Sequence, residues 1–302
     1  MKSTRHILAL ASTGCIFAAG LAAAGGPTVI LDDPAPMPAT MAPESAFSGG
    51  VGLKFGQMSF EQSDDSVDES DLNVFALNGY LRYDWNAWSV FADVNSVRRD
   101  IGDEDFDEFA PEGAMSYGLH AGRTFGSFYA GAFVGQNRFQ GDDADVFGDY
   151  VSGELYGLET EYRFNEAGAV FAQVGRADMV GDDGDVAFDG NFYRVGASYQ
   201  FANFGVAVDY EAGNSPDIFE DEGDGGGDYK AYSIEGSYEV RPNLTASFGY
   251  ERMDITANTE DDGSEDTITL GLAFAFGPKT DRHNLTTTYK PGLAAAWAET
   301  LD

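Results

Sequence analysis

Polar and apolar residues alternate along most of this chain, in segments of about ten residues. Near the end of the pattern, Leu270, Leu272 and Phe274 occupy every second position, with small residues between them. Successive side chains of a β-strand point to opposite faces, so a period of two predicts strands with one apolar and one polar face. The pattern therefore favours an all-β fold.

Twelve segments follow this alternation. We expect strands over 48–60, 72–84, 88–98, 115–125, 128–139, 150–164, 169–178, 191–201, 204–212, 229–240, 244–253 and 266–276. Prolines between residues 47 and 276 fall only in the connections, which agrees because proline cannot donate a hydrogen bond to a strand ladder. No stretch after residue 46 is apolar for 18 residues, so no membrane-spanning helix is expected there.

The connections alternate between short and long. The short ones centre on Trp85-Asn86, Gly126-Ser127, Asn165-Glu166, Ala202-Asn203 and Arg241-Pro242-Asn243. The long ones span 61–71, 99–114, 140–149, 179–190, 213–228 and 254–265. Short turns on one rim and long loops on the other are typical of a transmembrane antiparallel up-and-down β-barrel, here of about 12 strands. A soluble propeller is the alternative, but it would need four short strands in each repeat, whereas two longer ones fill each repeat here.

Aromatic residues gather where the strands meet the short connections, as in the interfacial girdle of a membrane barrel. They are Tyr83, Trp85, Trp88, Phe125, Phe128, Phe164, Phe201, Phe204 and Phe276.

The remaining chain divides into three parts. Residues 1–24 have a positive start, an apolar run and the sequence Ala22-Ala23-Ala24, so we expect a cleaved secretory signal peptide. Residues 25–46 are rich in proline and alanine and predict a periplasmic linker. We expect the barrel over 47–276 and a periplasmic C-terminal tail over 277–302.

Acidic residues dominate the charge of the chain, with 51 Asp and Glu against 17 Lys and Arg and a net charge of −34. This excess argues against nucleic acid as a partner, because phosphates would be repelled. Most acids lie in and beside the long loops, where clusters such as Asp182-Asp183-Gly184-Asp185 offer oxygen ligands for Ca²⁺. None has EF-hand spacing, so we favour a solvated acidic rim and expect no metal site.

The polar face of the strands would line the lumen if the apolar face meets lipid. By parity, the expected pore-lining residues are Lys54, Arg82, Asp93, His120, Glu159, Glu161, Arg163, Arg194, Asp209, Glu235, Glu239 and Glu251. Acids outnumber fixed bases in this set, which predicts a modest preference for cations. The alternative is that these charges pair across a closed, packed interior. Phe133 and Phe171 also fall on this face, which the polar pattern leaves unexplained.

Catalytic chemistry has little support in the sequence. Beyond the signal peptide the only histidines are His120 and His283. Ser116 shares a face with His120 but lies four residues away, about 13 Å along an extended strand, whereas proton transfer needs hydrogen-bond contact. The single cysteine, Cys15, lies in the signal peptide. We therefore expect no enzyme activity and no cofactor.

The last predicted strand resembles the assembly signal of Gram-negative outer-membrane β-barrel proteins. That signal combines a polar residue, a glycine and two aromatics, which correspond here to Thr269, Gly271, Phe274 and Phe276. The resemblance implies a location in the outer membrane of a Gram-negative bacterium. It also implies the barrel-assembly machinery, outer-membrane lipid and lipopolysaccharide as partners.

Together these observations predict a porin-like channel for passive diffusion of small hydrophilic solutes, with a modest preference for cations. The alternative is a non-conducting structural or surface-interaction barrel that presents acidic extracellular loops to a partner.

Overall fold

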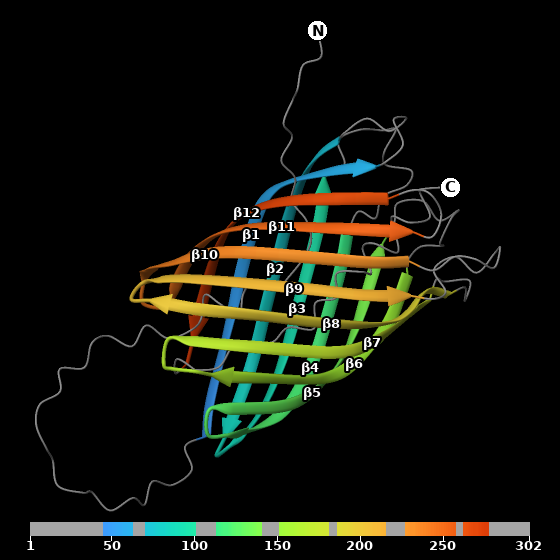
Figure 1. Ribbon diagram of the computed structural model, residues 1–302. Helices are drawn as coiled ribbons and strands as arrows, with labels where there is room; N and C mark the ends of the chain where they lie inside the picture. Colours follow the sequence, from blue (N-terminus) through green and yellow to red (C-terminus); the bar gives the residue numbers. More distant parts are fainter. Residues whose placement is uncertain are drawn as a thin grey trace, which may run out of the picture.

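The structure, a computed structural model, describes residues 45–62, 70–100, 113–140, 151–180, 186–215, 227–257 and 262–277. It contains twelve antiparallel strands that form one closed barrel, in which each strand pairs with its sequence neighbours and β1 pairs with β12 (Figure 1). The strands are β1 Ser45–Gln62, β2 Ser70–Trp85, β3 Trp88–Asp100, β4 Gly113–Phe125, β5 Phe128–Gln140, β6 Val151–Arg163, β7 Gly168–Val180, β8 Val186–Phe201, β9 Phe204–Ser215, β10 Gly227–Arg241, β11 Leu244–Ala257 and β12 Asp262–Phe276. Among these residues, no helix is long and apolar enough to cross a membrane.

All twelve predicted strands are confirmed, but several extend further towards the long loops than the side-chain pattern indicates. β8 begins at Val186 instead of 191, and β12 begins at Asp262 instead of 266. The backbone ladder continues there, with Glu265 paired to Phe60 of β1. Backbone hydrogen bonding between strands therefore extends beyond the segments in which polar and apolar side chains alternate. Beyond the apolar band the two faces of a strand no longer separate lipid from lumen, so their side chains need not differ in polarity.

Several predicted segments lie wholly or largely outside the described residues. They are the signal peptide over 1–24, most of the linker over 25–46, the tail over 277–302 and the central parts of the long loops. β1 begins at Ser45, two residues inside the predicted linker.

The five short connections are confirmed and lie together at one end of the barrel, on the left in Figure 1. Four are two-residue turns, and each contains a residue with positive φ: Asn86 at 53°, Gly126 at 63°, Ala202 at 51° and Asn243 at 71°. Glycine and asparagine tolerate this conformation well, so three of the turns have suitable residues. In the fifth connection, the side-chain oxygen of Asn165 accepts hydrogen bonds from the amides of Ala167 and Gly168, at 2.8 and 2.7 Å.

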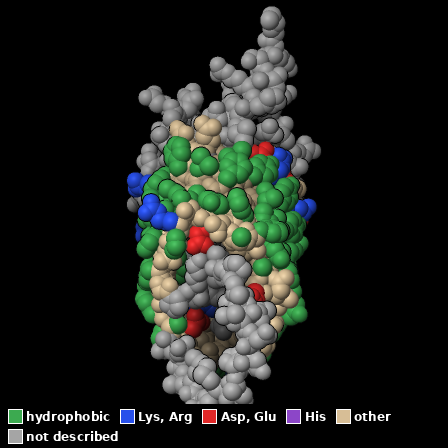
Figure 2. All heavy atoms as spheres, turned by 90° about the vertical axis from the view of Figure 1, so that its left-hand side faces the viewer, with side chains coloured by type: hydrophobic (Ala, Val, Ile, Leu, Met, Phe, Trp, Pro, Cys, Tyr) green, Lys and Arg blue, Asp and Glu red, His purple; other side chains and the backbone are tan. Residues whose placement is uncertain are grey.

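The outer wall of the barrel is apolar, and hydrophobic side chains are spread over the visible wall in Figure 2. Leu158 and Leu270, for example, are 63% and 62% exposed. Such a band of exposed apolar residues faces lipid in a membrane barrel. The predicted aromatic girdle lies at its short-turn edge, where Tyr83 stacks on Trp85 with ring centroids 5.6 Å apart.

A second aromatic girdle, which the sequence pattern had not indicated, lies towards the long loops. It consists of the outward-facing tyrosines Tyr117, Tyr156, Tyr193, Tyr210, Tyr232 and Tyr250. The Tyr232 hydroxyl donates to Asp254, and Tyr210 stacks on Tyr232 at 6.5 Å. Tyrosine suits this position because its ring can stay in lipid while its hydroxyl meets polar groups. The two girdles mark the two edges of the apolar band.

Ala202 is the turn residue that fits its conformation least well, because its Cβ meets steric resistance at positive φ. We predict that Ala202→Gly stabilises the barrel by about 0.5–1 kcal/mol, after allowing for the greater flexibility of glycine in the unfolded chain. Urea unfolding in lipid vesicles would show a higher midpoint with an unchanged slope. Gly126→Ala, at the matching position of another turn, should lower the midpoint. Equal midpoints for both variants would contradict this account.

Candidate functional site

The inner face of the barrel carries many charged and polar side chains, together with apolar ones such as Met58, Leu155 and Met253. Of the twelve expected lining residues, ten are buried on this face, while Arg163 and Glu239 are half-buried near the short turns. The ten are Lys54, Arg82, Asp93, His120, Glu159, Glu161, Arg194, Asp209, Glu235 and Glu251. Each is at most 7% exposed, so the side chains pack closely and any path through the lumen is narrow.

Lys54 of β1 reaches across two strands to Glu235 of β10, with its Nζ 2.7 Å from Oε2. The side chain can do this because the intervening strands present small residues. Gly271 of β12 is the register partner of Lys54, and Ser247 of β11 is the partner of Gly271. A Cβ on Gly271 would lie 3.2 Å from Cγ of Lys54, closer than ordinary contact. Gly271, predicted as part of the assembly signal, therefore also keeps room for this ion pair.

A second ion pair joins β8 and β9. The guanidinium Nη2 of Arg194 donates to Asp209 at 3.0 Å, and the Ser233 hydroxyl of β10 donates to the other oxygen of Asp209 at 2.9 Å. Glu211 is the register partner of Arg194 and Glu251 is that of Ser233, so four acids, with Glu235, gather on the inner face of β9, β10 and β11. We call Asp209, Glu211, Glu235 and Glu251 the acidic wall.

On the other side, His120 of β4 lies between two carboxylates. Its Nδ1 is 2.7 Å from Oε2 of Glu159 on β6, and its Nε2 is 2.9 Å from Oδ1 of Asp93 on β3. Its ring stacks on Phe91, with centroids 4.0 Å apart. Despite the three potential ligands, no group of His, Cys, Asp and Glu in the described ranges is arranged to hold a metal ion.

Two further interior ion pairs lie within single strands. Nε of Arg82 is 3.0 Å from Oδ2 of Asp84, and Nε of Arg163 is 3.8 Å from Oε1 of Glu161.

Aromatic residues on the inner face lie over glycines of neighbouring strands. A Cβ built on any of these glycines would come within 3.0 Å of the covering side chain. The pairs are Tyr129 over Gly122, Phe133 over Gly157, Phe171 over Gly196, Phe192 over Gly175 and Tyr229 over Gly213. This explains why Phe133 and Phe171 break the polar pattern: their rings lie along the wall and fill the gaps left by glycine.

Three inward-facing acids escaped the sequence reasoning, although parity could have found all three. Asp84 lies in the expected strand over 72–84, two residues after Arg82 and therefore on the same face. Glu211 lies in the expected strand over 204–212, two residues after Asp209 and therefore on the same face. Glu265 lies one residue before the expected strand over 266–276, and in the structure it is fully buried at 0% exposure. The expected strand excludes Glu265 because the alternation of polar and apolar residues ends before the backbone strand does, near the long loops.

The residues of the predicted assembly signal lie in the strand that closes the barrel. Thr269 and Gly271 face inward, whereas Phe274 and Phe276 face outward and are 49% and 37% exposed. Phe276 is the register partner of Gly49 on β1.

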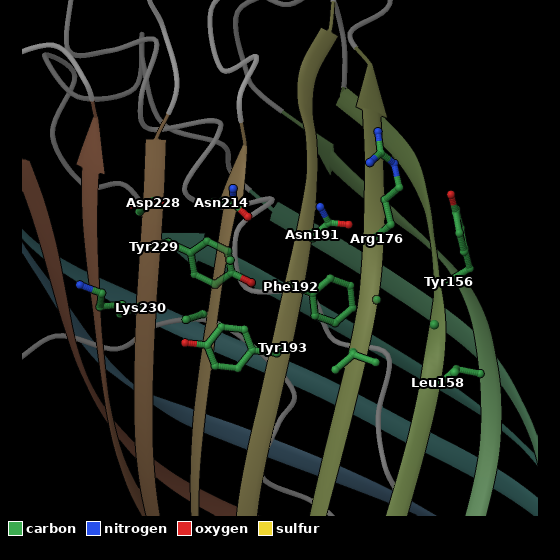
Figure 3. A pocket seen from close by; sticks show the side chains of 15 residues that line it. Tyr156, Leu158, Arg176, Asn191, Phe192, Tyr193, Asn214, Asp228, Tyr229 and Lys230 are labelled. Carbon is green, nitrogen blue, oxygen red and sulfur yellow. The ribbon is translucent and has the colours of Figure 1, made fainter.

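A separate groove of about 830 Å³ lies on the outer wall across β6 to β10 (Figure 3). Its outward-facing residues include Arg176 and Asn191 towards the loops and Leu158 and Tyr193 farther from them. Because the groove opens to the lipid side, it lies off the route through the barrel.

We predict that Gly122→Ala displaces the Tyr129 ring, whose atoms are the nearest contacts that a Cβ would meet at this position. The cost is about 1–3 kcal/mol of stability, as for other overpacked sites. The displaced ring also narrows the lumen, so single-channel conductance should fall. Gly122→Ala combined with Tyr129→Ala removes the clash and should restore the conductance. A Gly122→Ala protein with wild-type stability and conductance would show that the ring does not fill this gap.

Comparison with known proteins agrees with the architecture. A family model described as Gram-negative porin matches residues 122–283, more than half of the chain. Among solved structures, the NanC porin is 11% identical with a TM-score of 0.46 over 74% of this chain and 98% of that one. OmpT of Vibrio cholerae is 12% identical with a TM-score of 0.40 over 80% of this chain and 100% of that one. The Pseudomonas putida toluene transporter TodX is 11% identical with a TM-score of 0.38 over 76% of this chain and 89% of that one.

No curated protein sequence matches the chain significantly. The family model, together with a closed twelve-stranded barrel that is apolar outside and carries buried charges inside, settles the classification. The chain belongs to the Gram-negative porin family, whose members are outer-membrane channels.

Proposed function

We propose that this porin passes small hydrophilic solutes through a narrow lumen and prefers cations. The observation that carries the proposal is the charge of the inner face. Among inward-facing side chains that the structure describes, the acids are Asp84, Asp93, Glu159, Glu161, Asp209, Glu211, Glu235, Glu239, Glu251 and Glu265. The bases are Lys54, Arg82, His120, Arg163 and Arg194. Rings of acidic side chains favour cations in a water-filled pore.

Several buried polar atoms on the inner face favour water in the lumen. Both amide atoms of Asn78 and the hydroxyls of Ser116 and Thr269 have no hydrogen-bond partner among the described residues. Buried polar groups are rarely left unsatisfied, because each such group costs about 1–3 kcal/mol. Water supplies the missing partners at comparable sites. A dry, packed interior would instead favour apolar residues at these positions.

The narrow lumen sets the solute class. Close packing of the lining side chains favours ions and small polar molecules over bulky ones. The charged side chains on the inner face also favour polar solutes. An apolar solute would displace water from these charged groups without replacing the hydrogen bonds that the water makes.

The experiment is a measurement of reversal potential in a planar bilayer under a salt gradient. The wild-type protein should give stable open steps and a potential that favours cations. Glu211→Gln combined with Glu251→Gln removes two charges from the acidic wall and should lower the cation-to-anion permeability ratio. The matched control, Asp228→Asn, removes an acid from the outer wall and should leave the ratio unchanged.

A folded barrel that never conducts would contradict the proposal and favour the alternative of a closed surface-interaction barrel. If the protein conducts, but the double variant and the control have the same cation-to-anion permeability ratio, the role of the acidic wall is contradicted.

A further inference from the structure

His120 lies at the centre of a cluster that spans five consecutive strands. Its two carboxylate partners, Asp93 and Glu159, come from β3 and β6. Further side chains donate hydrogen bonds to these carboxylates. Asn95 donates to Asp93 at 3.2 Å, while Tyr129 of β5 and Gln173 of β7 donate to Glu159 at 2.9 and 3.2 Å. We call these six residues the histidine cluster.

With both carboxylates ionised, the hydrogen bonds set the charge of the cluster. An ionised carboxylate only accepts hydrogen bonds, so each ring nitrogen of His120 must donate a proton to its partner. An imidazole that donates from both nitrogens is an imidazolium cation. The cluster therefore holds two negative charges and one positive charge, with a net charge of −1 in place of the −2 of Asp93 and Glu159 alone.

Packing shields the two carboxylates from solvent. The side chains of Asp93 and Glu159 are 2% and 0% exposed, and that of His120 is 0% exposed. The His120 ring lies between two phenylalanines, with Phe91 at 4.0 Å and Phe133 at 5.6 Å between centroids. Phe133 in turn lies over Gly157 on the wall. The cluster is thus a closely packed, buried part of the inner face.

The acidic wall on β9 to β11 lies across the barrel from Asp93 and His120, since β3 and β4 are six strands from β9 and β10 in a closed order of twelve. Two of its four acids form ion pairs with fixed bases: Glu235 with Lys54, and Asp209 with Arg194. The two sides of the lumen therefore differ in net charge: the histidine cluster carries −1, whereas the acidic wall with its two bases carries −2.

We propose that His120 is a specificity-determining residue of this channel. It acts as a positioning residue, because it holds Asp93 and Glu159 in the buried cluster and cancels one of their charges. The preference for cations then rests on the acidic wall, and His120 limits its strength. This inference rests on the proposed function, since only a conducting lumen has a selectivity to set.

Three variants test the inference: two change the net charge of the cluster in opposite directions, and the third restores it. His120→Gln removes the positive charge but keeps a polar side chain, so the net charge becomes −2. Glu159→Gln leaves Asp93 and His120 as a neutral pair, so the net charge becomes 0. The two changes together return the net charge to −1.

The measurement is again the reversal potential in a planar bilayer under a salt gradient. His120→Gln should raise the cation-to-anion permeability ratio on the order of two- to threefold, the effect of one unit charge several ångströms from the path in a water-like dielectric. Glu159→Gln should lower the ratio by a similar factor. The double variant should return it close to the wild-type value, a rescue that lost packing alone would not produce.

An unchanged ratio in both single variants, with a conducting wild-type protein, would overturn the role of His120 while leaving the proposed function in place. A wild-type protein that does not conduct would overturn both. Loss of the heat-dependent shift in electrophoretic mobility would show that His120→Gln does not fold. In that case the cation-to-anion permeability ratio of Glu159→Gln tests the inference by itself. An unchanged or raised ratio in Glu159→Gln would overturn the inference on its own.

Discussion

Closure of the hydrogen-bond ladder is the constraint on which this structure depends. Lipid offers no partner to a backbone amide or carbonyl, so every strand at membrane depth must pair on both sides. The join between β1 and β12 meets this requirement, with register pairs that run from Gly49 and Phe276 to Gln62 and Gly263. Once the ladder is closed, strand alternation sends one set of side chains to lipid and the other to the lumen.

The charged side chains of the interior must then find partners, because buried charges are costly unless they are paired. The barrel solves this with contacts that cross intervening strands, and small residues make those contacts possible. Lys54 passes Gly271 and Ser247 to reach Glu235, and His120 of β4 reaches Glu159 of β6 across β5. In addition, the ring of Tyr129 lies over Gly122 on the neighbouring strand. Glycine thus provides room for both the charged contacts and the rings that cover the wall.

Sequence periodicity predicts the faces of this barrel well and the contacts on each face poorly. Period-two alternation is a local property, so it places Lys54 and Glu235 on the same side without showing that they meet. These residues are 181 positions apart, and their contact depends on barrel closure and register. Likewise, the inward position of Phe171 makes sense only beside Gly196 on the next strand. The loop ends of strands were missed because hydrogen bonding there continues without an apolar band.

The most direct test of the account asks whether ions pass along the inner face. A thiol introduced by Asn78→Cys would lie on the inner face, whereas one introduced by Leu77→Cys would lie on the outer face beside it. Silver ions are small, bind thiolates and enter narrow aqueous paths. The account predicts that silver blocks the current through Asn78→Cys and leaves the current through Leu77→Cys unchanged. Block of neither variant, or equal block of both, would contradict a conducting lumen.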